Sequence, residues 1–311
     1  MMLRHLSEKK RVLAVRSKAF QSVRDFFVAR GFLEVETPIR IPTPALELHI
    51  DAEPSAGMYL RTSPELHMKR LVAAGYEKVF QIGACFRHGE RGDLHNPEYT
   101  MLEWYRAGAN YIDVLADTKA LMAHVMKDIS GGLTLTYKGI SIEMLPLWDR
   151  MTVDDAFILH AGWDPVKNFN ADRFDLDLVE KVEPNFPKNR PIVLMDYPTR
   201  AAALSRCKKD HPEIAERWEL YIGGIEIANA FSELTDPVEQ RNRFMECAGE
   251  RREMGREVYA LDEPFLSALE AGMPECAGVA LGLDRLVMLL TDSPRIDDVR
   301  AFCARESGND T

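Results

Sequence analysis

The sequence predicts an α+β fold in which an antiparallel sheet is flanked by helices. Amphipathic helical stretches alternate with strands paired through short, turn-rich loops, an order typical of antiparallel sheets. The glycine fingerprints of a dinucleotide-binding fold and of a phosphate-binding loop do not occur, so a parallel, doubly wound sheet is not expected. Hydrophobic residues form 46% and charged residues 28% of the 311-residue chain, which suits a globular core rather than a disordered or fibrous chain.

Hydrophobic periodicity locates the elements in chain order. Apolar residues at helical spacing predict amphipathic helices over residues 11–30 and 110–128. Pro64 and Gly75 suit the two ends of a helix over 64–75, and a long charged helix is expected over about 236–255. Alternating or continuous apolar runs predict strands over residues 31–42, 59–65, 78–87, 98–107, 191–198 and 218–231. The segment 211–218 has a helical pattern, and residues 278–291 predict a strand that turns directly into a helix. Residues 129–190 show short mixed runs that favour no particular element.

The charge balance and the cysteines exclude several kinds of protein. The formal net charge is 39 − 49 = −10, so the electrostatic signature of a nucleic-acid-binding protein is missing. The sequence shows no signal peptide and no apolar stretch of about 18 residues, which predicts a cytoplasmic protein with no membrane partner. The five cysteines are scattered and never spaced as Cys-x-x-Cys, so we expect reduced thiols rather than disulfides or a zinc site. They are Cys85, Cys207, Cys247, Cys276 and Cys303.

Three segments carry recognisable motifs in a fixed order. They are GFLEVETPIRIP at 31–42, FRHGERGDLHNPEYTMLEWY at 86–105 and GVALGLDRLVML at 278–289. In order and character they resemble motifs 1, 2 and 3 of the class II aminoacyl-tRNA synthetases. The further segments TSPELHMKRL at 62–71 and GGIEIANAFSELTD at 223–236 are similar to the lysyl subgroup. The resemblance implies the catalytic-domain fold of that class, an antiparallel sheet flanked by helices.

The length of the chain leads to an expectation about its domains. Only 30 residues precede Gly31, whereas an ordinary small domain needs roughly a hundred. We therefore expect a single catalytic domain over 1–311, with motif 1 at about 12–42, motif 2 at about 78–107, motif 3 at about 278–291 and no anticodon-binding domain. This organisation resembles the stand-alone lysyl-type paralogues that adenylate β-lysine and transfer it to a lysine of elongation factor P. It implies that protein as acceptor and no stable tRNA binding.

Adenylation requires cations, because a carboxylate attacks the α-phosphate of ATP and both reactants are anionic. Arg87 resembles the motif 2 arginine that bridges the α-phosphate and the substrate carboxylate, a bidentate task suited to guanidinium. Arg285 resembles the motif 3 arginine that stacks on adenine. The resemblance thus makes Arg87 and Arg285 the catalytic residues, with ATP as the co-substrate.

The resemblance also implies ligands for ATP and magnesium. The residues expected to bind ATP are Arg87, His88, Gly89, Asn96, Tyr99, Glu226, Ile227, Gly282 and Arg285. Glu226 and Glu233 correspond to carboxylates that hold Mg²⁺ on the phosphates. Seven residues apart on a straight strand, these two glutamates would point to opposite faces, so sharing an ion requires a bend, which we expect at Asn229–Ala230.

The expected amino-acid pocket is net negative. Its residues, carried over from the lysyl subgroup, are Ser63, Pro64, Glu65, Glu103, Tyr105, Asn229, Phe231, Glu233 and Ala280. A desolvated ammonium group needs carboxylate partners, whereas an aspartate-type substrate would need Arg or Lys. The pocket therefore favours lysine or β-lysine, and the sequence leaves the choice between them open.

Two departures from the lysyl pattern bear on that choice. Motif 2 begins Arg87-His88-Gly89 instead of Arg-Asn-Glu, which leaves open whether Glu90 or the Gly89 backbone meets adenine. In motif 3, Ala280 replaces a glycine, and Ala230 replaces another; these methyl groups are expected to reshape the floor of the amino-acid site. We expect Ala280 to disfavour an α-amino group and to favour a β-amino group.

Other functions remain as alternatives. The net negative charge of the chain argues against a minimal lysyl-tRNA synthetase, which must bind tRNA. The acidic pocket argues against an ammonia-dependent amide synthetase, whose aspartate substrate is itself acidic. A non-enzymatic regulator would be expected to lose its ATP-binding groups, yet Arg87, Glu226, Glu233 and Arg285 all remain. Motif 1 builds a twofold interface in the resembled class, so a homodimer is expected.

Overall fold

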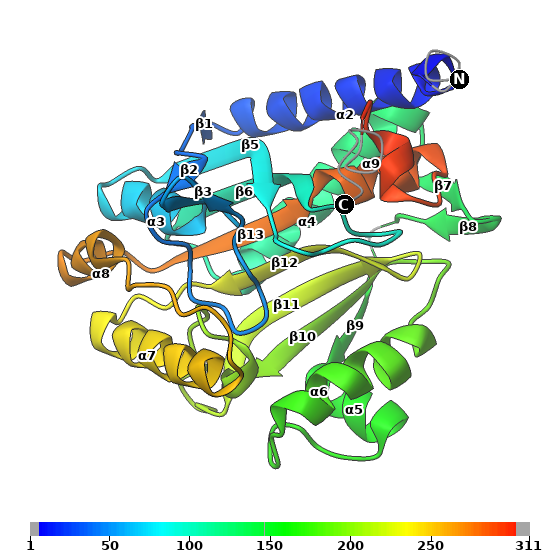
Figure 1. The fold of residues 1–311 in the computed structure, drawn as a ribbon. Helices are drawn as coiled ribbons and strands as arrows, with labels where there is room; N and C mark the ends of the chain where they lie inside the picture. The colour runs from blue at the N-terminus through cyan, green and yellow to red at the C-terminus, as the bar shows by residue number, and fades with distance from the viewer. Residues whose placement is uncertain (1–5, 146, 303–311) are drawn as a thin grey trace. The chain divides into compact units, whose positions relative to one another are not determined.

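The computed structural model describes residues 6–145 and 147–302 and divides the chain into two compact units. Unit 1 consists of Met1–Tyr105, Asp236–Met273 and Gly282–Thr311, and unit 2 of Arg106–Thr235 and Pro274–Leu281. Each contains helices and strands, which are labelled in Figure 1. The α+β prediction is confirmed, while the expectation of a single domain stays a prediction.

Unit 1 combines five α-helices with short and long strands among its described residues. The helices are α2 (Lys10–Val28), α3 (Glu65–Ala73), α7 (Pro237–Glu253), α8 (Glu263–Glu270) and α9 (Leu283–Thr291). The strands are β1 (Leu33–Glu34), β2 (Arg40–Ile41), β3 (Pro54–Ser55), β4 (Met58–Leu60), β5 (Lys78–Phe86) and β6 (Glu98–Ala107), the last belonging to this unit up to Tyr105. β1 runs parallel to β5, β5 neighbours β6, and β2, β4 and β3 form a small antiparallel sheet.

The core of unit 1 forms where α2 covers β5 and β6. Its buried face includes Phe26 and Phe27, as the helical spacing predicts. The Phe27 ring stacks on Phe80 of β5 at 4.9 Å and lies 5.2 Å from Trp104 of β6. α2 also packs beside α9 (Figure 1), so the motif 1 helix and the motif 3 helix are neighbours within this unit.

Unit 2 contains a set of adjacent strands covered by helices. Its helices are α4 (Tyr111–Ser130), α5 (Val153–Ala161), α6 (Ala171–Asp177) and the π-helix η1 (Leu178–Val182). Its strands are β7 (Thr134–Tyr137), β8 (Ile140–Glu143), β9 (Asp149–Thr152), β10 (Ile192–Pro198), β11 (Ile214–Ile222), β12 (Ile225–Ser232) and β13 (Cys276–Gly282). β10 to β13 pair antiparallel in chain order, whereas β9 pairs parallel to β10.

Alternation along β11 and β12 separates two faces of this sheet. Trp218 pairs with Ala230, and the Trp218 Nε1 donates to the Tyr111 carbonyl at the start of α4 over 2.6 Å, so this face packs on α4. On the other face, Glu219 of β11, Asn229 of β12 and Ala280 of β13 form a row of cross-strand neighbours. Ala230 therefore lies on the opposite face from Asn229, and the expectation that its methyl group reshapes the amino-acid site is wrong.

Most of the predicted elements are present, and three differ for local reasons. The strand expected at 218–231 is a hairpin, because Gly223 (φ 62°) and Gly224 (φ 80°) adopt the left-handed conformation of a tight turn. The helical pattern at 211–218 is overridden, since residues from Ile214 onward pair with β10. The segment 31–42 forms only the short strands β1 and β2, and Pro38 lies between them.

The cysteines and membrane-spanning potential can be stated for the described residues. Among the described residues, Cys85, Cys207, Cys247 and Cys276 form no disulfide bond, and burial raises the pKa of Cys85 to about 12. Cys303 lies outside the described residues. In the described part of the chain, every helix is too short or too polar to cross a bilayer.

Candidate active site

The segment 61–65 of unit 1 is held against β5 by a buried arginine. Arg61 is 2% exposed, its Nε donates to the Ala84 carbonyl over 2.9 Å, and its Nη1 donates to the Thr37 carbonyl over 2.8 Å. Gly83 makes room for it, because a Cβ there would lie 2.3 Å from Arg61 Nη2. The residues that follow Arg61 therefore start from a fixed position on β5.

Ser63 links the two acidic residues expected in the amino-acid pocket, through the backbone of one and the side chain of the other. Its Oγ accepts the Glu65 backbone N–H over 2.9 Å and donates to Glu103 Oε1 over 2.6 Å. Tyr105 donates to Glu103 Oε2 over 2.8 Å. Pro64 lies directly before α3, as expected of a proline at a helix start. The structure thus brings together the predicted pocket residues Ser63, Glu65, Glu103 and Tyr105.

This carboxylate group is buried, and its electrostatics favour a cationic ligand. Burial, followed by repulsion from Glu65, raises the pKa of Glu103 to about 7, although hydrogen bonds from Ser63 and Tyr105 oppose the shift. Glu65 forms an ion pair with the fully buried Lys69 Nζ. With both glutamates ionised, the charges of Glu65, Glu103 and Lys69 sum to −1. A bound ammonium group would bring the net charge of this buried cluster to zero.

Lys69 was not among the predicted pocket residues. A signal for it exists, because Glu65 and Lys69 stand four residues apart in a predicted helix, the spacing at which opposite charges meet. The sequence does not reveal that the pair is buried. Burial makes this lysine the resident counter-ion of Glu65 rather than a solvated surface charge.

Arg87 lies beyond the end of β5 and contacts the aromatic residue expected to meet adenine. Its guanidinium is 5.3 Å from the centre of the Tyr99 ring, and its Nη1 is 3.5 Å from Glu90 Oε1. The Tyr99 hydroxyl donates to the Thr62 carbonyl over 2.8 Å. Tyr99 therefore links the predicted catalytic arginine to the segment that carries Ser63.

The head of the motif 2 loop is held by the chain before β3. The Arg87 N–H donates to the Pro97 carbonyl over 2.9 Å, as in a hairpin, and the His88 N–H donates to the Asp51 carbonyl over 2.8 Å. His88 Nδ1 lies 2.8 Å from Glu53 Oε2. Gly89 follows with φ 76°, a conformation that other residues rarely adopt. Whether Glu90 or Gly89 meets adenine stays a prediction.

Arg285 begins the motif 3 helix and reaches the far end of the same loop. Its Nη2 is 2.8 Å from His95 Nε2, beside the buried Asn96, and its Nε donates to the Leu94 carbonyl over 3.3 Å. A Cβ on Gly282 would make only ordinary contact with Arg285 atoms, the nearest at 3.6 Å. Internal packing therefore does not require glycine at 282, which suits a position left open for a ligand.

In unit 2, a β-bulge aligns the remaining predicted residues on one face. Ala228 pairs with Leu220 but Glu226 pairs with Tyr221, so Ile227 is an extra residue in β12. The bulge places Glu226 on the face of Tyr221 and Asn229, and Glu226 acts electrostatically on Tyr221. The bend expected at Asn229–Ala230 exists but lies at Ile227. Phe231, and Glu233 two residues further, share this face by alternation.

Glu226 and Glu233 offer carboxylate donors of the kind that magnesium binds. Carboxylate oxygens are the donors that Mg²⁺ prefers, and the bulge explains how both can face one side. Across residues 6–145 and 147–302, no three His, Cys, Asp or Glu side chains are grouped as a complete metal site. Glu226 and Glu233 would therefore need phosphate or water oxygens to fill the coordination shell.

Some of the predicted site residues belong to unit 1 and the others to unit 2. The unit 1 group contains Ser63, Pro64, Glu65, Arg87, His88, Gly89, Asn96, Tyr99, Glu103, Tyr105, Gly282 and Arg285. The unit 2 group contains Glu226, Ile227, Asn229, Phe231, Glu233 and Ala280. Lys69, Arg217 and Glu219 neighbour members of these groups, and Arg61 holds the segment that carries Ser63. All four were missed, because their roles depend on burial and strand register.

The sequence matches the family described as tRNA synthetases class II (D, K and N) over residues 1–306, and the chain belongs to this family.

Relatives with curated names agree with this assignment. The chain is 37% identical to the lysine–tRNA ligase of Moorella thermoacetica, covering 95% of this chain and 65% of that protein. It is 36% identical to the lysine–tRNA ligase of Thermoanaerobacter sp., covering 97% of this chain and 66% of that protein. It is 38% identical to the lysine–tRNA ligase of Dehalococcoides mccartyi, covering 98% of this chain and 66% of that protein. The chain therefore spans just under two thirds of the length of these relatives.

Proposed function

We propose that this protein activates lysine or β-lysine as an aminoacyl-adenylate, using ATP and magnesium. The observation that carries the proposal is the buried group of Ser63, Glu65 and Glu103, which Tyr99 connects to Arg87. Carboxylates are suited to the ammonium end of the substrate, and the Arg87 guanidinium to its carboxylate and the α-phosphate. Glu226 and Glu233 would hold magnesium.

Pyrophosphate exchange tests the activation step directly. The full chain with ATP, Mg²⁺ and labelled pyrophosphate should form labelled ATP when lysine or β-lysine is present. Aspartate should not support exchange, because it would bring a second carboxylate to an acidic pocket. Exchange with aspartate, or with neither lysine isomer, would contradict the proposal, and exchange with aspartate would favour an amide synthetase.

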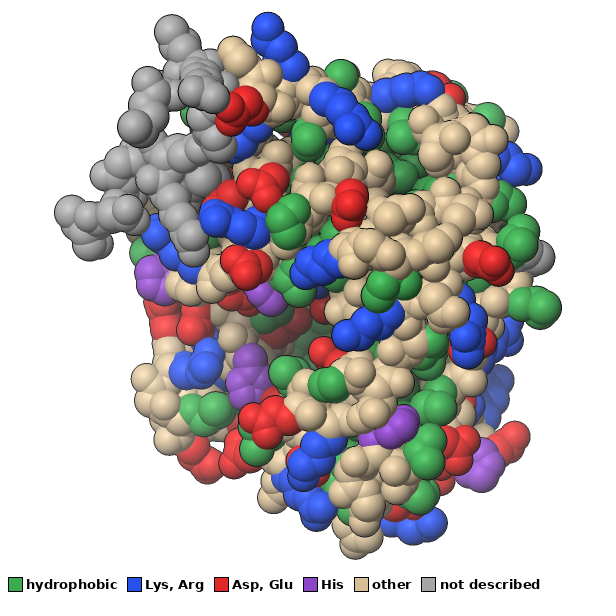
Figure 2. All heavy atoms as spheres, turned by 90° about the vertical axis from the view of Figure 1, so that its right-hand side faces the viewer, with side chains coloured by type: hydrophobic (Ala, Val, Ile, Leu, Met, Phe, Trp, Pro, Cys, Tyr) green, Lys and Arg blue, Asp and Glu red, His purple; other side chains and the backbone are tan. Residues whose placement is uncertain are grey.

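We further propose that the activated amino acid is transferred to a lysine of elongation factor P. Support comes from Ala280, which stands directly opposite Asn229 in place of the lysyl-type glycine, and from the formal charge of −10. On the face shown in Figure 2, Lys and Arg side chains are interspersed with Asp and Glu rather than gathered into one basic surface. An acidic, mixed surface suits a protein acceptor better than a polyanion.

The acceptor is identified by offering candidates separately. The enzyme is incubated with ATP, Mg²⁺ and the labelled isomer that supports exchange, and elongation factor P or total tRNA is added. Label is expected on elongation factor P, with no label on a variant of that protein lacking the acceptor lysine. Label on tRNA alone would favour the minimal tRNA ligase and would overturn the choice of acceptor, while leaving activation intact.

We also propose a homodimer built on the motif 1 region. Three large apolar side chains of this region, Val28, Leu33 and Ile39, are between 42% and 62% exposed. Covering such side chains is a common reason for twofold association.

Sedimentation equilibrium should give a dimer at micromolar concentration. Leu33→Glu should shift the protein to the monomer. Met245→Glu, which changes an exposed side chain of α7, should remain a dimer. A monomeric wild-type protein would refute the dimer.

A further inference from the structure

Arg217 of unit 2 has no place in the reaction described so far, yet it touches a predicted substrate residue. It lies on β11, and its Nε donates to Asn229 Oδ1 over 3.2 Å. Its Nη2 donates to Glu219 Oε1 over 2.5 Å, and its Nη1 donates to the Ala201 carbonyl. The guanidinium also lies 4.4 Å from the centre of the Tyr197 ring. Because these contacts engage all three nitrogens and one face of the guanidinium, they fix the orientation of the Arg217 side chain.

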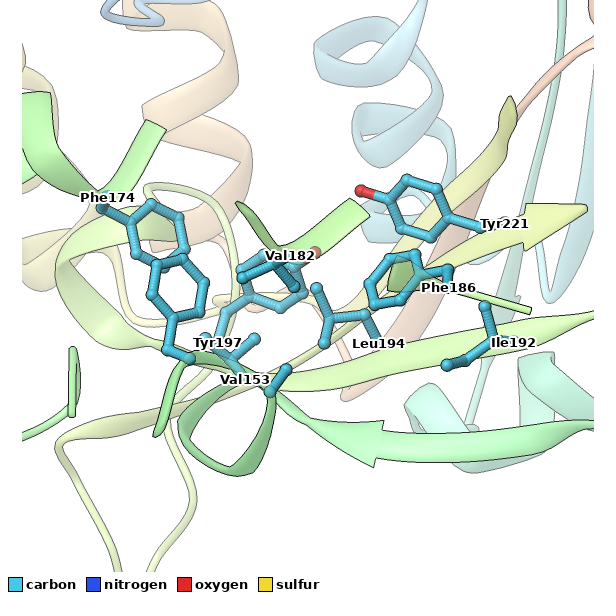
Figure 3. Packing of buried hydrophobic residues seen from close by; sticks show 10 residues of the cluster. Val153, Phe174, Val182, Phe186, Ile192, Leu194, Tyr197 and Tyr221 are labelled. Atoms are coloured by element: carbon cyan, nitrogen blue, oxygen red, sulfur yellow. The ribbon is translucent and has the colours of Figure 1, made fainter. Parts of the chain in front are cut away.

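Glu219, the counter-ion of Arg217, is itself held by two buried tyrosines. The Tyr197 and Tyr221 hydroxyls each donate to Glu219 Oε2 over 2.6 Å. Both rings belong to the apolar cluster that β10 and β11 form with α5, α6 and η1, where Phe186 meets Tyr221 edge-on (Figure 3). Glu219 is therefore anchored by the hydrophobic core, and Arg217 is anchored by Glu219.

This network determines which end of the Asn229 amide is available to a ligand. A guanidinium has five N–H donors and no acceptor, so only the oxygen of the amide can face Arg217. The usual ambiguity between the oxygen and nitrogen of an asparagine is thereby removed. With Oδ1 engaged, the Nδ2 group presents two N–H donors on the face that carries Phe231 and Ala280.

We propose that Arg217 is a positioning residue that fixes the Asn229 amide as a hydrogen-bond donor for the carboxylate of the bound amino acid. This inference rests on the proposed function. Without Arg217 the amide could turn over and present its oxygen, which would repel a carboxylate. Arg217 would thus control whether unit 2 distinguishes a carboxylate from a neutral carboxamide, without touching the substrate itself.

The test compares binding of the amino acid that supports exchange with binding of its carboxamide, measured by calorimetry on the full chain. The wild-type protein should prefer the carboxylate by about 10- to 100-fold, the range expected for a charge-assisted hydrogen bond. In Arg217→Met this ratio should fall about ten-fold, and Arg217→Lys, which keeps the charge and N–H donors but not the planar fork, should restore part of it. Arg206→Met is the matched control, since Arg206 pairs with Glu216 and Glu275 of the same unit. Its ratio should equal that of the wild type.

Asn229→Asp provides a second variant in case Arg217→Met does not fold. The new carboxylate can pair with Arg217, so thermal stability should be kept, but its outer oxygen accepts instead of donating. Binding of the amino acid should weaken by at least about ten-fold relative to its carboxamide. A folded Arg217→Met with the wild-type ratio, or an Asn229→Asp that binds the amino acid as well as the wild type, would overturn the inference. If the wild-type protein exchanges no lysine isomer and binds neither ligand, the proposed function fails as well.

Discussion

Ser63 Oγ donates to Glu103 Oε1 over 2.6 Å while accepting the backbone N–H of Glu65. One serine thus holds two acidic residues whose positions in the chain are 38 apart, since 103 − 65 = 38. The two carboxylates remain close in spite of their repulsion, because Lys69 pairs with Glu65 and Tyr105 donates to Glu103. A cationic substrate would relieve that repulsion.

The first prediction concerns folding stability and pH. Burial raises the pKa of Glu103 to about 7, so the folded protein holds a proton that the unfolded chain, with an ordinary pKa of 4.5, has lost. The Glu103 contribution is therefore complete below pH 4.5 and is lost as pH rises through 7, by about 3 kcal/mol. In chemical denaturation, Glu103→Gln should lack this decline between pH 5 and 8. Equal pH slopes for the two proteins would contradict the assignment.

A second prediction concerns the role of the Glu103 carboxyl group in substrate binding. An ammonium ion favours ionised Glu103, so binding should release a proton and affinity for lysine should rise between pH 6 and 8. Calorimetry in buffers of different ionisation enthalpy counts the released proton. Glu103→Gln should bind more weakly, and its affinity should not follow pH through 7. Wild-type affinity that stays constant over this range would exclude Glu103 as the titrating group.

A third prediction tests the support of segment 61–65. Gly83→Ala would put a methyl group 2.3 Å from the Arg61 guanidinium, so Arg61 must move and overpacking should cost about 1–3 kcal/mol. Because Arg61 precedes Ser63, KM for lysine should rise. The matched control is Gly249→Ala in α7, where a Cβ meets nothing within 4 Å and helix propensity should leave stability equal or slightly higher. Gly83→Ala with wild-type melting temperature and KM would show that Arg61 is not a constraint.

A fourth prediction concerns the catalytic arginine. Arg87→Lys keeps the charge but loses the bidentate fork, so kcat for pyrophosphate exchange should fall by about 10²–10³ with an unchanged melting temperature. Arg24→Lys serves as control, because Arg24 forms an exposed pair with Glu34. Full exchange activity in Arg87→Lys would mean that a point charge is sufficient.

A fifth prediction concerns the choice between lysine isomers. Ala280 is the cross-strand neighbour of Asn229, and removing its methyl group in Ala280→Gly should shift the ratio of kcat/KM for β-lysine over α-lysine by about 5- to 100-fold toward α-lysine. Ala230→Gly, on the face that packs on α4, should lower stability without changing the ratio. An unchanged preference in Ala280→Gly would remove the role assigned to Ala280.

Local sequence determined the elements whose signals lie within a few residues. The helical spacing of apolar residues located α2, and a long charged run located α7. Apolar runs on either side of a turn-rich loop located β5 and β6, and a glycine-containing strand located the passage from β13 into α9. The motif residues were predicted differently, from the resemblance to class II synthetases that their order along the chain carries. The pattern at 211–218 shows the limit, since pairing with β10 outweighs a weak helical preference.

Only the tertiary structure decided how those residues act on one another. Cross-strand register at the Ile227 bulge places Glu226 on the face of Asn229, and a one-residue difference in register cannot be deduced from alternation. Burial turns the Glu65–Lys69 spacing into a desolvated ion pair and raises the pKa of Glu103. Arg217 reaches Asn229 from a neighbouring strand. The sequence by itself therefore determined which chemical groups are present, and the packing of strands and helices decided which of them face one another, because desolvation and register arise only between segments distant in the chain.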